Sequence, residues 1–156
     1  MKTEPQQEHQ WLQKLVGEWA VTSATASEVS GGEWVERVRS LDGLWVVAEG
    51  QGEMPDGGPA VTMMTLGYDP RRQRYVGTWV GSMMTHLWVY EGTLDESGTV
   101  LTLDCEGPDF ETQGRLTRYQ DIITIVDDDH RILTARMLTA DGTWKQLMSM
   151  RYRRSK

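Results

Sequence analysis

Few side chains in this sequence stand in the patterns that catalysis or metal binding requires. The three histidines, His9, His86 and His130, are too far apart to share one helical turn or one strand face, as ligand pairs normally do. The aspartate run 127–129 lacks the spacing of an EF-hand loop and is typical of a solvated turn. We therefore predict no metal site and no cofactor.

Carboxylates and the single thiol give an equally weak indication of catalysis. Glu49 with Glu53, and Asp104 with Glu106, stand at even spacing within predicted strands. Strand alternation generates such pairs on any solvated face, so they do not indicate acid–base chemistry. Cys105 has no nucleophile motif around it, and we expect it to pack as a small apolar residue.

The informative side chains are large, flat or polarizable. The sequence contains seven tryptophans, five tyrosines and nine methionines but one phenylalanine. A tryptophan or tyrosine can bury about 150–250 Å² against its neighbours, and methionine adapts to irregular shapes. This composition suits either an irregular core or the wall of a cavity for an apolar molecule.

The elements that carry these residues are predicted to be one short helix followed by strands. Residues 8–16 place apolar side chains at helical spacing, and Gly17 ends that pattern. Thereafter β-branched and aromatic segments alternate with turns rich in Gly, Asp and Pro. We predict ten strands at 18–25, 33–41, 44–53, 60–68, 74–82, 86–94, 100–106, 115–126, 132–138 and 144–153.

The turns between these strands are short, which predicts that consecutive strands pair antiparallel. They include Ser30-Gly31-Gly32, Asp42-Gly43 and Asp141-Gly142. Closing the sheet removes its two edges, so the predicted fold is all-β: one antiparallel up-and-down barrel spanning 1–156 as a single domain. Several strands are partly apolar on both faces, so alternation leaves open which face points inward.

Charge and composition bear on partners and location. The net charge of −7 and isoelectric point near 4.9 repel phosphate backbones, so nucleic acid is not an expected partner. The opening residues 1–10 are polar, one cysteine excludes an internal disulfide, and no apolar run is long enough to span a bilayer. We expect a cytoplasmic protein that does not enter a membrane.

The segment from Lys14 to Trp19, KLVGEW, resembles the start of lipocalin-like, calycin-type barrels. The resemblance implies that the helix plugs one end of the barrel and that Gly17 lets the chain turn into the first strand. It also implies that Trp19 packs near the barrel floor against an arginine of the last strand. Arg151 or Arg153 is the candidate for this cation–π contact.

Nearly the whole chain resembles the bacterial family called domain of unknown function 1579. The segments that carry the likeness are 15–19, LVGEW; 66–70, LGYDP; 75–83, YVGTWVGSM; and 150–152, MRY. In that family an aspartate commonly precedes the Ser-Met pair, whereas this chain has Gly81. The family implies a fold and no established activity. Some related small barrels bind haem through one histidine, which makes His86 the residue to test for that role.

From these observations we expect a protein that binds a small hydrophobic or amphipathic molecule inside the barrel. The first alternative is an isomerase or hydrolase that uses a cavity carboxylate or His86. The second is a structural module, or a homodimer formed through the outer face or an edge, with no ligand. The expected lining residues are Trp79, Trp88, Tyr90, Met63, Met84, Glu49 and Arg118.

Overall fold

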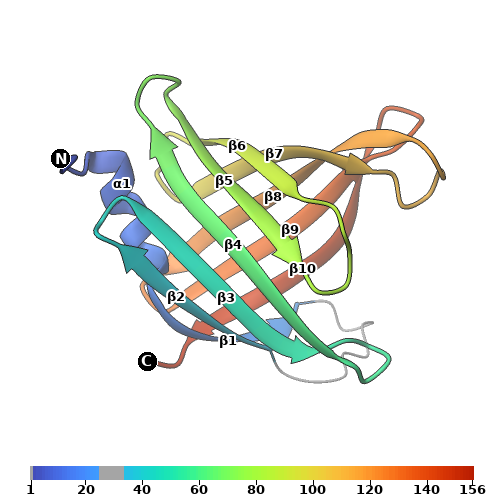
Figure 1. Ribbon diagram of the computed structural model, residues 1–156, viewed down its shortest axis with the longest axis horizontal. Helices are drawn as coiled ribbons and strands as arrows, with labels where there is room; N and C mark the ends of the chain where they lie inside the picture. The colour runs from blue at the N-terminus through green and yellow to red at the C-terminus, as the bar shows by residue number, and fades with distance from the viewer. Residues whose placement is uncertain (1, 25–33) are drawn as a thin grey trace.

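The chain forms a closed antiparallel barrel with one short helical segment at its end (Figure 1). The computed structural model describes residues 2–24 and 34–156. The predicted turn at Ser30-Gly31-Gly32 and the predicted strand ends at residues 25 and 33 lie outside these ranges. The described strands are β1 (Gly17–Ser23), β2 (Trp34–Leu41), β3 (Trp45–Glu53), β4 (Pro59–Asp69), β5 (Arg74–Gly81), β6 (Trp88–Leu94), β7 (Val100–Pro108), β8 (Leu116–Asp127), β9 (His130–Leu138) and β10 (Trp144–Arg154).

Strand pairing follows chain order around the ring, and the last strand pairs with the first. Every described pairing is antiparallel, and β1 lies between β2 and β10. The ten-stranded up-and-down barrel predicted from the turns and strand lengths is therefore confirmed. Within the described ranges, no helix has the length and apolarity needed to cross a bilayer.

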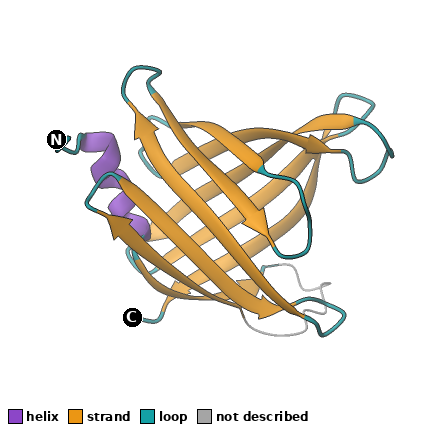
Figure 2. Ribbon diagram, in the orientation of Figure 1, coloured by secondary structure: helices purple, strands orange, loops and turns teal. Residues whose placement is uncertain are grey.

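The helical segment covers one end of the barrel (Figure 2). The helix α1 (Gln7–Leu12) continues into a 3-10 turn, η1 (Gln13–Leu15). The indole nitrogen of Trp11 donates to the carbonyl of Gly98 at 2.7 Å, and the hydroxyl of Tyr75 donates to the carbonyl of Glu8 at 3.2 Å. These bonds tie the plug to strands or turns that lie far along the chain.

The helical region, residues 7–15, begins and ends one residue before the predicted helix at 8–16 and is less regular. Val16 is already extended, with φ −67° and ψ 135°, because the chain must leave the plug and enter β1 there. The amide of Val16 still donates to the carbonyl of Gln13 at 3.2 Å, which tightens the last turn to 3-10 geometry.

Trp19 on β1 is the buried residue that joins the plug to the barrel. Its side chain is 1% exposed, and its indole nitrogen donates to the carbonyl of Leu15 at 2.9 Å. The guanidinium of Arg131 lies 4.6 Å from the centre of the Trp19 ring, and that of Arg154 lies 4.3 Å away. Two arginines from the last two strands therefore contact this ring by cation–π interactions.

Arg154 also fastens the chain at the start of β1. Its guanidinium donates to the carbonyls of Val16 and, at 3.0 Å, Lys14. Gly17 has a φ of +138°, and a Cβ there would lie 2.3 Å from an Arg154 nitrogen. Glycine is thus required at this position both for the backbone conformation and for the close approach of Arg154.

The predicted partner of Trp19 was wrong, although the predicted strand was right. Arg151 pairs across the ladder with Thr22 and is exposed, and Arg153 is also exposed. Successive residues of a strand face opposite sides, and Arg154 is the residue that pairs with Trp19. Arg151 therefore lies on the outer wall rather than against the plug.

The loops that connect the strands lie at two opposite ends of the barrel. The turns β2–β3, β4–β5, β6–β7 and β8–β9 lie at the same end as α1 (Figure 1). The connections β3–β4, β5–β6, β7–β8 and β9–β10 lie at the opposite end, where α1 does not reach. Any opening into the interior is therefore expected at this second end, which we call the open end.

We predict that Trp19→Ala lowers the free energy of unfolding by about 3–5 kcal/mol, as other large-to-small core changes do. The substitution empties a buried site and removes the ring that both arginines contact. Urea denaturation followed by far-UV circular dichroism measures this loss. Trp45→Ala is the matched control. Because Trp45 is 42% exposed, its replacement should lower the free energy of unfolding clearly less. Equal losses for the two variants would contradict the role assigned to Trp19.

Candidate functional site

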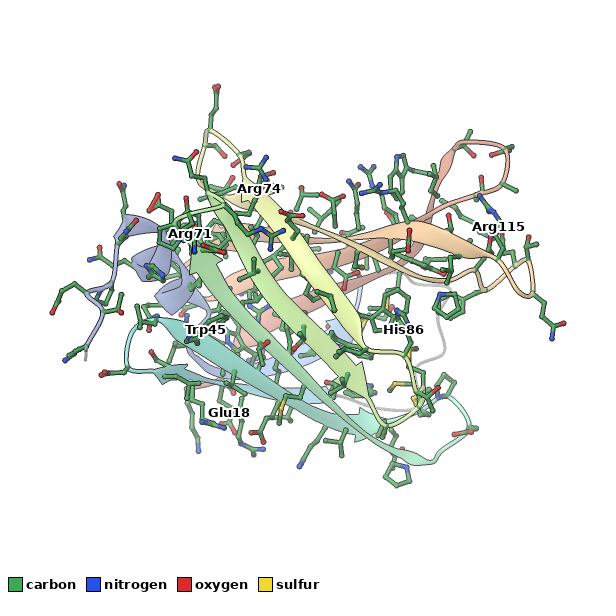
Figure 3. All side chains as sticks on the ribbon, turned by 45° about the horizontal axis from the view of Figure 1, so that its top comes forward. Glu18, Trp45, Arg71, Arg74, His86 and Arg115 are labelled. Atoms are coloured by element: carbon green, nitrogen blue, oxygen red, sulfur yellow. The ribbon has the colours of Figure 1, made fainter. Side chains whose placement is uncertain are left out.

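The barrel encloses a cavity of about 390 Å³. It extends to the open end, where several lining side chains remain partly accessible: Phe110 is 59% exposed and Met148 is 37% exposed. Figure 3 places His86 and Arg115 at this end, away from α1. The aromatic and sulfur-containing lining residues are Trp34, Met54, Met64, Trp79, Met83, Met84, Trp88, Tyr90, Cys105, Phe110, Tyr119, Met148, Met150 and Tyr152.

An aromatic cluster forms the wall near the open end. The rings of Trp88 and Tyr119 meet edge to face, with centroids 4.8 Å apart, and Phe110 lies 5.6 Å from Tyr119. Trp88 lies flat over Gly107, where a Cβ would come within 2.3 Å of the indole. A side chain at that position would displace the ring, so the glycine on β7 allows Trp88 to occupy the cavity wall.

One carboxyl group, that of Asp121, lies deep in this apolar wall. Asp121 on β8 accepts a hydrogen bond from the hydroxyl of Tyr90 on β6. Burial raises the pKa of Asp121, although the bond from Tyr90 opposes that rise. Among the described residues, no ion pair includes Asp121.

A second carboxylate, Glu36 on β2, lines the same cavity but is neutralised. Arg131 on β9 donates to it at 2.7 Å, and the Arg131 side chain is 4% exposed. The same guanidinium lies 4.0 Å from the centre of the Tyr152 ring. Burial, together with the charge of Glu36, raises the pKa of Tyr152, so its hydroxyl keeps its proton.

Cys105 lies on the cavity wall as an unreactive thiol. Its sulfur donates a long bond of 3.9 Å to the carbonyl of Tyr119. Burial and the charge of Asp121 raise its pKa to about 12. Because the thiolate is the nucleophilic form, the thiol is inert near neutral pH, as the sequence analysis expected of a packed cysteine.

The structure brings four of the predicted lining residues together. Trp79, Trp88, Tyr90 and Met84 all line the cavity, and the indole nitrogen of Trp88 lies 3.1 Å from the sulfur of Met84. Trp79 on β5 pairs directly with Trp88 on β6, so both rings project from the same side of the ladder.

The other three predicted lining residues face outward, and their assignment to the interior was wrong. Met63 is 39% exposed, while its neighbour Met64 lines the cavity. Glu49 is exposed and pairs with Arg39 at 3.5 Å. Arg118 is exposed between inward-facing neighbours on β8. Each of these side chains lies on the outward face of its strand, a choice that the alternation in the sequence had left open.

His86 lies beside the cavity rather than in its lining. Its ring meets that of Trp88 edge to face at 4.6 Å, and its Nε2 lies 2.9 Å from the carbonyl of Glu106. The other two histidines are elsewhere, with His9 in the plug and His130 paired to Asp127 on the outside. Within residues 2–24 and 34–156, no group of three His, Cys, Asp or Glu side chains could hold a metal ion.

Sequence reasoning missed the polar residues of the interior. Asp121 alternates with Tyr119 and Ile123 on β8, and Glu36 alternates with Trp34 and Val38 on β2. A charged residue in phase with apolar neighbours was the available signal. The prediction instead placed Glu49 and Arg118 in the lining, because the inward face of each strand was not known.

These features define a class of protein: a closed ten-stranded, lipocalin-like barrel with a plugged end, an open end and an apolar cavity between them. Residues 4–154 match the family model described as protein of unknown function DUF1579. The chain belongs to this family. None of the curated proteins matches it significantly.

We predict that Arg131→Met lowers the free energy of unfolding by about 3–5 kcal/mol, because it leaves Glu36 buried without its counter-charge. The double variant Arg131→Met/Glu36→Leu should regain most of this loss, since it removes both charges. Urea denaturation of the two single variants and the double variant completes a double-mutant cycle. Losses that simply add would show that the two side chains are not coupled.

Proposed function

We propose that this protein binds a small, mainly apolar molecule inside the barrel. The observation that carries the proposal is the cavity of about 390 Å³, which reaches the open end and is lined mainly by aromatic and sulfur-containing side chains. Small-molecule sites are typically concave, largely apolar and supplied with a few polar groups that fix orientation. Here Tyr90 and Asp121 supply such groups.

The composition of the wall supports binding of a flexible guest. Six methionines line the cavity: Met54, Met64, Met83, Met84, Met148 and Met150. Methionine side chains are flexible and polarizable, so they adjust to guests of irregular shape. Partly exposed Met83, Phe110 and Met148 extend the apolar surface to the open end.

An enzymatic role has one supporting observation, the raised pKa of Asp121 beside an open cavity. The groups around it argue for binding instead. The pKa of Cys105 is raised to about 12 and that of Tyr90 lies well above its usual value, so both keep their protons at neutral pH. A single acid with protonated neighbours can orient a guest by hydrogen bonding without activating a nucleophile.

We predict that Ala135→Phe weakens binding of the neutral dye N-phenyl-1-naphthylamine by about tenfold or more, equivalent to about 1.4 kcal/mol. Ala135 lines the cavity, so the added ring occupies space that a guest needs. Dye fluorescence in a titration measures the dissociation constant. Native mass spectrometry of the purified wild-type protein then looks for a co-purified small molecule.

Thr134→Phe is the matched control for this experiment. Thr134 is the preceding residue of β9 and lies on the opposite face of the strand, so its variant should bind the dye as the wild type does. A wild-type protein that does not bind the dye, or an Ala135→Phe variant that binds it equally well, would contradict a guest in the cavity.

Self-association is a second candidate function, and a patch on the outer wall favours it. The exposed side chains of Val61, Met63, Val80, Leu87 and Val89 lie on β4, β5, β6 and the turn before β6. Met63 and Val80 are direct partners in the ladder, so the patch is continuous across strands. We call these five residues the outer apolar patch. Contiguous apolar surface of this kind is typical of interaction sites.

If the outer apolar patch forms a homodimer, Val80→Lys should convert the dimer to a monomer, because it buries a charge in the interface. Sedimentation velocity measures the oligomeric state. Thr134→Lys places the same charge on β9, away from the patch, and should leave the dimer intact. A wild-type protein that sediments as a monomer at high concentration would remove this candidate.

A further inference from the structure

The charges around the cavity do not balance. Its described lining includes two carboxyl groups, Glu36 and Asp121, and no lysine, arginine or histidine. Arg131 lies outside the described lining, against the rings of Trp19 and Tyr152, and is committed to Glu36 at 2.7 Å. From the described side chains, Asp121 accepts one hydrogen bond, donated by Tyr90. The cavity therefore holds one acidic group that no cation among the described residues neutralises.

The surrounding rings are suited to a positive charge. Trp34, Trp79, Trp88 and Tyr119 line the same space as Asp121. The face of an aromatic ring carries partial negative charge and attracts cations, most strongly for tryptophan and in a site shielded from water. A cation in this cavity would thus meet favourable charge from the rings as well as from the carboxylate.

We propose that the guest of this cavity is an apolar molecule bearing one protonated amine, with its ammonium group at Asp121 and its apolar part directed toward the open end. The inference deepens the proposed binding function and rests on it. The ammonium would donate to the Asp121 carboxylate, and the apolar part would contact the methionines and tryptophans of the wall.

Competing head groups fit this cavity less well. A hydroxyl can hydrogen-bond to Asp121 or Tyr90 but brings no charge to offset the burial of the carboxylate. A carboxylate guest would be repelled by Asp121 and would find no free cation in the part of the wall that the structure describes, because Arg131 is paired with Glu36. A charge-assisted bond from an ammonium is about twice as strong as a neutral one.

The proposal also fixes the direction of the pH dependence. The titratable or charged groups near Asp121 are Tyr90 on β6, Cys105 on β7, Tyr152 on β10 and the Glu36–Arg131 pair. The tyrosines and the thiol have raised pKa values and stay neutral up to mildly basic pH, and Arg131 is paired with Glu36, so Asp121 is the group whose charge a cationic guest would meet. A cationic guest binds its ionised form, and its affinity should rise as pH rises through the pKa of Asp121.

The test compares three guests of equal chain length: octylamine, octanol and octanoate. Isothermal titration calorimetry at pH 7 should give octylamine an affinity about tenfold or more above octanol, with octanoate the weakest. Octylamine should bind more tightly at pH 7.5 than at pH 5, whereas octanol should not change. Circular dichroism confirms that each variant is folded.

Two variants identify the group responsible. Asp121→Asn keeps the size and an oxygen acceptor for Tyr90 but loses the charge. The affinity for octylamine should therefore fall to that for octanol, and it should no longer depend on pH. Asp104→Asn is the matched control, because Asp104 on β7 pairs outside the cavity with Gln120 at 2.8 Å. This variant should bind all three guests as the wild type does.

The outcomes separate this inference from the proposed function. Octanol binding as tightly as octylamine, or an amine preference that survives Asp121→Asn, would overturn the amine but leave a guest in the cavity. Binding of the neutral dye without any binding of octylamine would do the same. Failure of the dye and of all three guests would overturn both the amine and the binding function.

Discussion

Closure of the sheet between β1 and β10 is the constraint on which the other features depend. Trp19 stands opposite Arg154 at this seam, and its ring also contacts Arg131 of the next strand. Once the barrel is closed, alternate side chains of each strand point inward, and the number of strands, ten, sets the width of the interior. The plug fills one end of that interior, and the cavity is the part that side chains leave unfilled.

The sequence was sufficient to predict the order of elements, because turn residues and β-branched segments are local signals. It was not sufficient to predict the phase of each strand. Met63 and Met64 are adjacent residues of the same type, yet Met63 belongs to the outer apolar patch while Met64 lines the cavity. The register shift in β10 between Gln146 and Met148 further breaks the alternation there. Phase of this kind depends on pairing across strands, which no single segment specifies.

The buried polar residues could be found only with the neighbours in place. Glu36 and Arg131 are separated by most of the chain, and their contact exists because β2 and β9 lie on either side of β1 and β10 in the closed ring. Each would be costly to bury alone, and the ion pair compensates the two charges, although Nε of Arg131 has no hydrogen-bond partner among the described residues. Pairing of this kind does not account for Asp121. Among the described residues, no strand places an arginine or lysine in an ion pair with that carboxyl group.

Stability and the proposed binding function place opposite demands on Asp121. In the empty barrel, burial disfavours its charged form, so the group opposes folding more strongly as pH rises through its raised pKa. The ladder around it does not need a carboxylate, since its backbone bonds and the apolar residues Tyr119 and Ile123 already hold β8 in place. A cation in the cavity would reverse the sign of this contribution, because the ionised acid then gains a partner. A carboxyl group that weakens the empty protein and would strengthen an occupied one would make folding and binding thermodynamically linked.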